Sequence, residues 1–230
     1  MTGNQADKHL VITIDGPAGS GKSTVAKVLA KKMSYVYLDT GALYRAVAWQ
    51  AYQEEVSETD EDALAELCRE TAIRLVRVES QSRVIVNGED VSDKLRDEHI
   101  GMFASRISAF GRVREALLPL QHEMGKAGSI IAEGRDMGSV VFPNAAVKFY
   151  LDAALSERSQ RRYQEILSRS GKADYEAVEK DLMIRDEQDR NRKSAPLRIP
   201  DDAVIIDTTA MDVQGVVQLM LDVVSQKIPR

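Results

Sequence analysis

A glycine-rich loop between two apolar segments constrains this chain more than any other feature. Residues 12–27 read ITIDGPAGSGKSTVAK, with a strand-like VITID before the loop and a helix-like STVAKVLAKKM after it. Gly16, Gly19 and Gly21 can adopt positive φ, which lets successive backbone N–H groups turn toward one point. The start of the following helix adds free N–H groups and the positive end of its dipole. The stretch therefore predicts an anion site between a buried strand and a helix.

Lys22, Ser23 and Thr24 complete a known pattern. Glycine, four residues and Gly-Lys-Ser form the Walker A loop, which binds the phosphates of a nucleotide. Lys22 would contact β- and γ-phosphate oxygens, and the Ser23 hydroxyl would bind Mg²⁺ together with phosphates and water. The alternative is a strand-to-helix turn that is glycine-rich by chance; the strand and helix around it favour the phosphate loop. The predicted loop comprises Gly16, Pro17, Ala18, Gly19, Ser20, Gly21, Lys22, Ser23 and Thr24.

Four further apolar runs predict the rest of a parallel sheet. They are YVYLD at 35–39, SIIAE at 129–133, AAVKFYLD at 145–152 and AVIIDT at 203–208. Helical patterns separate them, so we expect an α/β fold with helices on both faces of the sheet. Ligands of such sheets bind beyond the carboxyl ends of the strands. The polar residues that end these runs are therefore candidate site residues: Asp15, Asp39, the Glu133–Asp136 turn and Asp152.

Two stretches interrupt the alternation. Residues 72–91 alternate apolar and polar positions and contain Asn87-Gly88, which predicts an antiparallel hairpin within an insertion at about 67–106. Residues 155–195 are charged and rich in arginine, with a break at Ser170-Gly171 between two helical patterns. A charged helical hairpin is often only a solvated surface. Beside a phosphate loop it can instead be a mobile lid that brings positive charge to the substrates.

The predicted organisation is one P-loop domain over residues 1–230. Its core would take up about 10–66, 107–154 and 196–230, with the insertion at about 67–106 and the lid at about 155–195.

Composition narrows the function classes. Of 230 residues, 43% are hydrophobic and 29% charged, with a net charge of −5, so the basic footprint of a nucleic-acid-binding protein is absent. Binding of nucleic acid through the arginines of 155–195 is disfavoured for the same reason. Cys68 is the single cysteine, which fits a reducing cytoplasm, and its apolar surroundings predict a buried side chain. No apolar run reaches the ~20 residues of a membrane span, and the histidines lack metal-ligand spacing.

Arginines indicate the second substrate. A phosphate acceptor is mostly deprotonated near neutral pH and needs no general base, but it must approach a highly negative triphosphate. Arginine suits this task through permanent charge and bidentate contacts. Arg45 lies a turn and a half into the helix after the second run, and Arg135 follows the SIIAE run. In RDEQDRNR, the spacing predicts Arg185, Asp189 and Arg192 on one helix face; the alternative is a surface pair of Arg185 and Asp189.

Together, these motifs carry a family resemblance. IDGPAGSGKST, LDTGALYRAVAW, SRISAFGRVRE, EGRDMGSVVFP and RDEQDRNRKSAPL resemble the bacterial cytidylate kinases, which are P-loop nucleoside monophosphate kinases. The resemblance extends from about residue 10 to 225. It implies a P-loop NTPase fold with a five-stranded parallel sheet flanked by helices, a small three-stranded antiparallel insertion and a helical lid. It also implies a cytoplasmic enzyme that phosphorylates CMP and dCMP with ATP and Mg²⁺.

The resemblance also implies roles for individual residues. The acceptor phosphate would be bound by Thr40, Tyr44, Arg45, Arg135 and Arg192; the sugar by Arg185 and Asp189; and the cytosine by Ser105, Arg114 and Asp136. The expected catalytic residues are Lys22, Arg135, Arg161, Arg162 and Arg192. Two positions depart from some relatives. Glu133 stands where some have aspartate, and two roles are expected for it: a longer contact to Mg²⁺ through water, or a structural hydrogen bond. Ser23 stands where some have glycine, so Thr24 could share the Mg²⁺ chemistry.

Two rival functions remain open at this point. One is a related small P-loop kinase that acts on UMP, and the other is a GTP-dependent switch. A switch would be supported by an Asn-Lys-x-Asp motif, which the sequence lacks. The expected partners are ATP or ADP and CMP or dCMP, with no nucleic acid and no membrane, and we expect a monomer.

Overall fold

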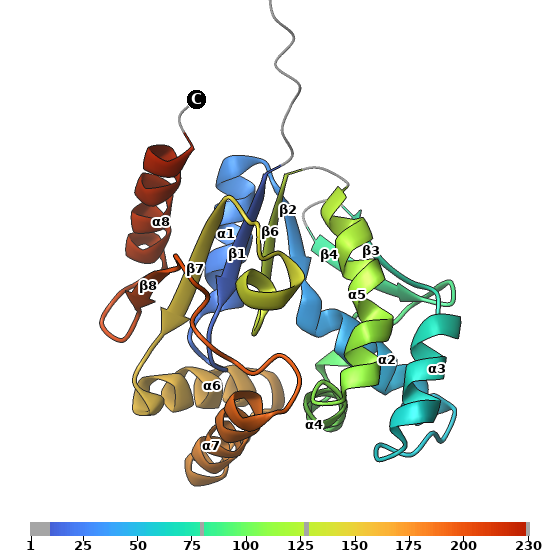
Figure 1. Cartoon of the computed structure of the whole chain (residues 1–230). Helices are drawn as coiled ribbons and strands as arrows, with labels where there is room; N and C mark the ends of the chain where they lie inside the picture. The colour runs from blue at the N-terminus through green and yellow to red at the C-terminus, as the bar shows by residue number, and fades with distance from the viewer. Residues whose placement is uncertain (1–9, 79–80, 127–128, 229–230) are drawn as a thin grey trace, which may run out of the picture. The chain divides into compact units, whose positions relative to one another are not determined.

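The glycine-rich loop lies at the carboxyl edge of a five-stranded parallel sheet in the computed structural model (Figure 1). The model describes residues 10–78, 81–126 and 129–228. The strand order is β2-β6-β1-β7-β8, and β1 (Val11–Asp15), after which the loop begins, is the central strand. The other strands are β2 (Val36–Asp39), β6 (Ile130–Gly134), β7 (Val147–Asp152) and β8 (Val204–Asp207).

The described residues group into two units. The P-loop unit consists of the described residues of Met1–Leu38, Met124–Asn191 and Ala195–Arg230. The second unit consists of the described residues of Asp39–Glu123 and Arg192–Ser194.

One face of the sheet carries the main core of the P-loop unit. Helices α1 (Lys22–Met33) and α8 (Val213–Lys227) pack on each other over this face, where Ile12, Ile14 and Phe149 are fully buried. Since burying one such side chain is worth about 1.5–3 kcal/mol, this apolar layer holds the strands in place.

The opposite face of β1 and β7 is more polar. Thr13 and Lys148 are neighbours across the parallel pair, and both are buried. A turn of π-helix, η2 (Met137–Val141), covers β1 and β6 on this side. Lys148 Nζ donates a 2.9 Å bond to Asp202 Oδ1. This face therefore contacts a short π-helical turn and the loop of Asp202, rather than a long apolar helix.

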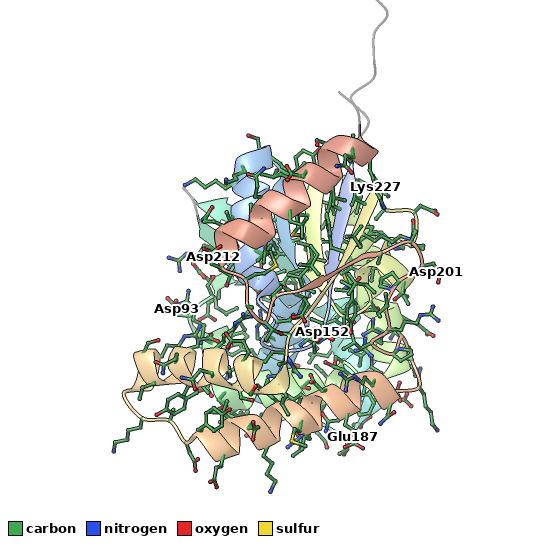
Figure 2. The ribbon with its side chains drawn as sticks, turned by 90° about the vertical axis from the view of Figure 1, so that its left-hand side faces the viewer. Asp93, Asp152, Glu187, Asp201, Asp212 and Lys227 are labelled. Atoms are coloured by element: carbon green, nitrogen blue, oxygen red, sulfur yellow. The ribbon has the colours of Figure 1, made fainter. Side chains whose placement is uncertain are left out.

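Two helices of the lid segment lie together at the end of the sheet where the parallel strands finish (Figures 1 and 2). They are α6 (Leu155–Ser170) and α7 (Tyr175–Asn191). Gly171 ends α6 with φ 69°, the left-handed conformation that favours glycine. Val178 and Leu182 form a small apolar cluster with Ala18 of the glycine-rich loop. The lid segment is thus packed on the loop through α7.

The second unit combines helices with an antiparallel sheet. Its three-stranded sheet has the order β3-β4-β5, and α2 packs against α3 and α4. Its elements are α2 (Thr40–Gln53), α3 (Glu61–Glu70), β3 (Ile73–Val78), β4 (Gln81–Val86), β5 (Glu89–Asp90), η1 (Lys94–Arg96), α4 (Glu98–Ile107) and α5 (Gly111–Lys126), whose last turn belongs to the P-loop unit.

The fold class expected from the sequence is confirmed. The five predicted strands form the parallel sheet, and Asn87-Gly88 connects β4 to β5 with φ 48° and 90°, as a type I′ hairpin turn requires. Cys68 is buried, which raises the pKa of its thiol to about 12. The boundaries of the core, the insertion and the lid as segments of a single domain stay predictions.

Candidate functional site

The glycine-rich loop has the backbone geometry that its sequence predicts. Gly16, Gly19 and Gly21 have φ of 145°, 77° and 89°. Gly16 is also held close to β7, because a Cβ atom built on it would lie 2.0 Å from the backbone oxygen of Leu151. A side chain at this position would therefore push the loop away from the sheet.

The helix after the loop begins without a side-chain cap, as α6 also does. Aspartates cap α2, α3, α4 and α8 by accepting bonds from first-turn N–H groups. In α1 the N-cap residue is Gly21, no side chain caps the helix, and the first turn has no acidic residue. The N–H groups of this turn and the dipole thus favour an external anion.

Lys22 folds back over the loop. Its Nζ atom donates a 2.6 Å bond to the backbone oxygen of Pro17, and the side chain is almost fully buried. Burial, followed by repulsion from Arg135, lowers the pKa of Lys22 to about 7. A phosphate oxygen would reverse this shift, since it supplies the negative charge that the buried ammonium lacks.

Arg135 follows β6 and is paired with Asp189 of α7. The Arg135 Nε atom lies 2.7 Å from Asp189 Oδ2. Partial burial alone would lower the pKa of Arg135, but attraction to Asp189 and to Glu133 raises it. Asp189 itself is buried. The P-loop unit therefore brings the two predicted site residues Arg135 and Asp189 together. Both charges affect the pKa of Lys22: Arg135 lowers it and Asp189 raises it.

The neighbouring Glu133 accepts a 2.7 Å bond from the Tyr37 hydroxyl. This contact is one of the two roles expected for Glu133, a structural hydrogen bond. The other expected role, a contact to Mg²⁺ through water, stays a prediction.

The two expected lid arginines have different partners. Arg161 donates to the hydroxyl of Thr208 at 3.0 Å and to its backbone oxygen at 2.7 Å. The Thr208 hydroxyl lies 3.1 Å from the backbone oxygen of Ser20 in the glycine-rich loop. Arg162 forms a half-exposed pair with Glu165, one turn away on the same helix. Arg161 is thus linked to the loop through Thr208, whereas Arg162 is held locally.

Arg158 holds the lid helices on the loop. Its Nη1 atom donates to the backbone oxygen of Ala18 at 3.1 Å and to Asp186 Oδ2 at 2.6 Å. Both charged side chains are buried. From its place on α6, Arg158 therefore links α7 to the loop, although the second Asp186 oxygen, Oδ1, has no hydrogen-bond partner among the described residues.

In the second unit, Arg45 is oriented by its own helix cap. Asp39 caps α2 by accepting from the N–H of Ala42 at 3.0 Å, and its other oxygen accepts from Arg45 at 2.8 Å. Thr40, the first residue of α2, is buried. The guanidinium retains further N–H groups, because arginine has five donors.

The same unit brings two more predicted residues together. The Arg114 guanidinium lies over the Tyr44 ring, 5.6 Å from its centroid, and donates to the backbone oxygen of Ser108 at 3.2 Å. Ser105 lies on α4, partly exposed. Contact with the Tyr44 ring and the bond to Ser108 hold the Arg114 guanidinium in place, and a planar guanidinium can meet the edge of a base.

One detail of the sequence interpretation is wrong. Arg192 does not lie on the helix of Arg185 and Asp189, because α7 ends at Asn191 and Arg192 belongs to the second unit. The alternative of a surface pair of Arg185 and Asp189 does not fit the structure, because Asp189 is buried and bonds Arg135. The helical spacing is correct up to the end of the helix, and the nearby Pro196 is a signal for an earlier end. A common phosphate contact of Arg45, Arg135 and Arg192 stays a prediction.

Two residues with clear links to the loop were missed. Thr208 ends the AVIIDT run, and the rule that strand ends line the site could have identified it. Asp186 has no such signal, because its partner Arg158 lies 28 residues away.

The residues near the loop fit a magnesium ion. Ser23, in the first turn of α1, presents an exposed hydroxyl. Among the described residues, no group of three or more His, Cys, Asp or Glu side chains could hold a metal. A dedicated all-protein site is therefore absent from these residues, and Mg²⁺ would take most ligands from phosphates and water, as it commonly does. No helix in the described ranges combines the length and apolarity needed to cross a bilayer.

Comparison with known proteins identifies the family of this chain. The family model described as cytidylate kinase matches residues 12–226. The chain belongs to the cytidylate kinase family. A cytidylate kinase of Citrifermentans bemidjiense is 46% identical over 222 residues, covering 96% of this chain and 95% of the relative. A cytidylate kinase of Bacillus subtilis is 43% identical over 221 residues, covering 96% of this chain and 99% of the relative. A gluconokinase structure from Sinorhizobium meliloti aligns over 95% of this chain and 93% of that chain, with 14% identity and a TM-score of 0.49.

Proposed function

We propose that this protein transfers the γ-phosphoryl group of ATP to CMP and dCMP, giving CDP or dCDP and ADP. One observation supports this more than any other: an arginine after β6, Arg135, lies near enough to Lys22 to lower its pKa. Two cations at one edge of the sheet suit two phosphate groups that must approach each other. Family membership supports cytosine nucleotides as the acceptors.

The donor would bind to the glycine-rich loop. The triphosphate oxygens would replace the Pro17 carbonyl as the hydrogen-bond acceptor of Lys22. They would also accept bonds from the uncapped N–H groups of α1. Ser23 would hold Mg²⁺ together with phosphate oxygens and water. When bound, the ion neutralises charge on the β- and γ-phosphates.

The acceptor attacks without a general base. Its phosphate oxygen is already deprotonated near neutral pH, so the new O–P bond forms as the bond to ADP breaks. Arg135, oriented by Asp189, would hold the acceptor phosphate, and we assign Arg45, Arg192, Thr40 and Tyr44 of the second unit to the same phosphate. Arg161 and Arg162 would neutralise the transferring group. Catalysis would thus come from positioning and charge stabilisation.

Base selection would depend on how the hydrogen-bond donors and acceptors of the base match those of the protein. Cytosine presents two acceptors and an amino donor, which match Arg114 and Asp136, respectively. Uracil reverses two of these groups and would leave buried polar groups unpaired, which a site can use to reject a base. Ser105 would contact the base edge. Arg185 and Asp189 would bind the sugar.

An assay of ADP release across CMP, dCMP, UMP, AMP and shikimate tests the proposal. We expect fast turnover with CMP and dCMP and much slower turnover with UMP. Equal rates with UMP would overturn the assigned base contacts, and an absence of ADP release with every acceptor would overturn the kinase activity itself.

We further propose a cytoplasmic monomer that acts in pyrimidine metabolism and binds neither nucleic acid nor a membrane. The single buried cysteine fits a reducing compartment, and the net charge of −5 disfavours nucleic acid. Light scattering at assay concentration tests the oligomeric state: a mass near 25.5 kDa is expected, and twice that mass would contradict it.

A further inference from the structure

A buried carboxylate joins the end of β1 to the loop after β6. The Asp15 Oδ1 atom accepts from the N–H of Met137 at 2.7 Å, and Oδ2 accepts from the N–H of Gly138 at 2.8 Å. The donors are 122 and 123 residues away along the chain, and Asp15 is fully buried. Both oxygens are therefore used to hold one distant segment of backbone.

This arrangement is costly to the fold. Taking an ionised carboxylate out of water is unfavourable unless it is paired and hydrogen-bonded. Burial raises the pKa of Asp15, and the two backbone bonds only partly oppose this shift. No arginine or lysine forms a salt bridge with Asp15 among the described residues. An apolar side chain would avoid this cost but would leave the N–H groups of Met137 and Gly138 without their acceptor, so the carboxylate serves the turn rather than the apolar core.

The segment held by Asp15 carries two assigned acceptor residues. Arg135 and Asp136 directly precede Met137. The backbone oxygen of Asp136 accepts from Val140 at 2.9 Å and from Val141 at 3.1 Å, which closes the turn of η2. Fixing the N–H groups of Met137 and Gly138 thus fixes the turn from which Asp136 projects.

The same turn is pressed against the sheet. A Cβ atom built on Gly138 would lie 2.8 Å from Thr13 Oγ1, 3.0 Å from Pro200 Cγ and 3.2 Å from Lys148 Cδ. No larger residue fits unless the turn moves away from β1, and such a movement would break the bonds to Asp15.

We propose that Asp15 is a positioning residue for the acceptor nucleotide: it holds the Arg135–Gly138 turn in register with the glycine-rich loop. The next residue, Gly16, starts that loop and is fixed against Leu151 of β7. One strand end therefore sets the donor loop and the acceptor turn relative to each other within the P-loop unit. The inference rests on the proposed role of Arg135 and Asp136 in binding CMP.

The test compares Asp15→Asn with Thr13→Val. Asparagine keeps one acceptor oxygen but turns an amide donor toward the second N–H group. Valine at position 13 removes a buried hydroxyl from the same strand face; its oxygen has no hydrogen-bond partner among the described residues. KM for CMP, KM for ATP and kcat are measured for each variant. Amide hydrogen exchange of the peptide that contains Met137 and Gly138 is measured in the absence of nucleotide.

For Asp15→Asn we expect KM for CMP to rise roughly tenfold, the order expected for a lost bond to a charged group. KM for ATP should change less than twofold, and amide exchange in the turn should accelerate. Thr13→Val should leave all of these values near those of the wild type. Equal changes in both KM values, or unchanged exchange in the turn, would overturn the inference.

A second variant keeps the test decisive if Asp15→Asn does not fold. Gly138→Ala reaches the same turn from the sheet side, and the inference again expects KM for CMP to rise more than KM for ATP. Equal changes in this variant would overturn the inference. The amide-exchange result needs no substrate. A wild type without activity on CMP would contradict the proposed function, while faster exchange in Asp15→Asn would still support the link between Asp15 and the turn.

Discussion

The Arg158 guanidinium lies 2.6 Å from Asp186 Oδ2, and both side chains are buried between α6, α7 and the glycine-rich loop. Removing one partner leaves an uncompensated buried charge. Arg158→Ala and Asp186→Ala should each lower the free energy of unfolding by about 3–5 kcal/mol. The loss in the double variant should be smaller than the sum, because the second change removes the stranded charge. Urea unfolding of the four proteins measures this coupling.

The half-exposed pair of Arg162 and Glu165 on α6 is the matched control. Breaking it should cost less than about 1 kcal/mol, because solvent screens both charges. Additive losses for Arg158 and Asp186 would mean that the buried contact is not energetically coupled.

Local patterns predicted the parts of the fold that depend on neighbours in sequence. The loop glycines, the Asn87-Gly88 hairpin and the break at Gly171 are all present where the sequence indicates them. Each depends on backbone preferences of two or three consecutive residues, so the sequence contains the whole signal.

Contacts across long sequence separations escaped the same reasoning. Arg158 is charged and lies in a charged segment, yet it is buried because Asp186 and the Ala18 carbonyl satisfy it. Asp15 could be identified as a strand-end carboxylate, but its use to hold Met137 and Gly138 follows only from the pairing of β1 with β6. Contacts between residues that only the tertiary structure brings together produce no periodic pattern in the sequence.

Ionisation of Asp15 should weaken the fold as pH rises. Burial raises the pKa of Asp15 from 3.8 to about 6; the Gly138 and Met137 N–H groups and Lys22 lower it, and Asp136 raises it further. The folded protein therefore holds this proton more tightly than the unfolded chain. The stabilisation is fully present below about pH 3.8 and is lost as pH rises through about 6.

The comparison with Asp15→Asn isolates this effect. Relative to the variant, the wild type should lose about 2.4 kcal/mol of unfolding free energy between pH 4 and pH 7. Urea unfolding at four pH values measures the difference, in which the other carboxylates cancel. Parallel curves for the two proteins would contradict a raised pKa.

Thr208 should support the donor side of the reaction. Its hydroxyl accepts from Arg161 and can donate to the backbone oxygen of Ser20 or Asp152. Thr208→Val keeps the shape but loses these bonds, so kcat should fall roughly tenfold, as for a lost bond to a charged group. Thr208→Ser keeps the hydroxyl and should restore most of the rate. Steady-state kinetics with saturating ATP measure both, and a valine variant with the wild-type rate would remove Thr208 from the assigned machinery.

Arg114 should discriminate cytosine from uracil. Its guanidinium lies over the Tyr44 ring and is buried, so its N–H donors are held in a defined place. Arg114→Met keeps much of the apolar stem but removes the donors. The ratio of kcat/KM for CMP to that for UMP should fall at least about tenfold. In the wild type, uracil leaves the Arg114 donors unpaired, and the variant no longer has these donors. KM for ATP should stay within twofold. Arg112→Met is the control: it removes an exposed arginine two residues earlier on the same helix, paired with Asp62. If the Arg114 variant lost activity on both bases by the same factor, Arg114 would bind the acceptor without reading its base.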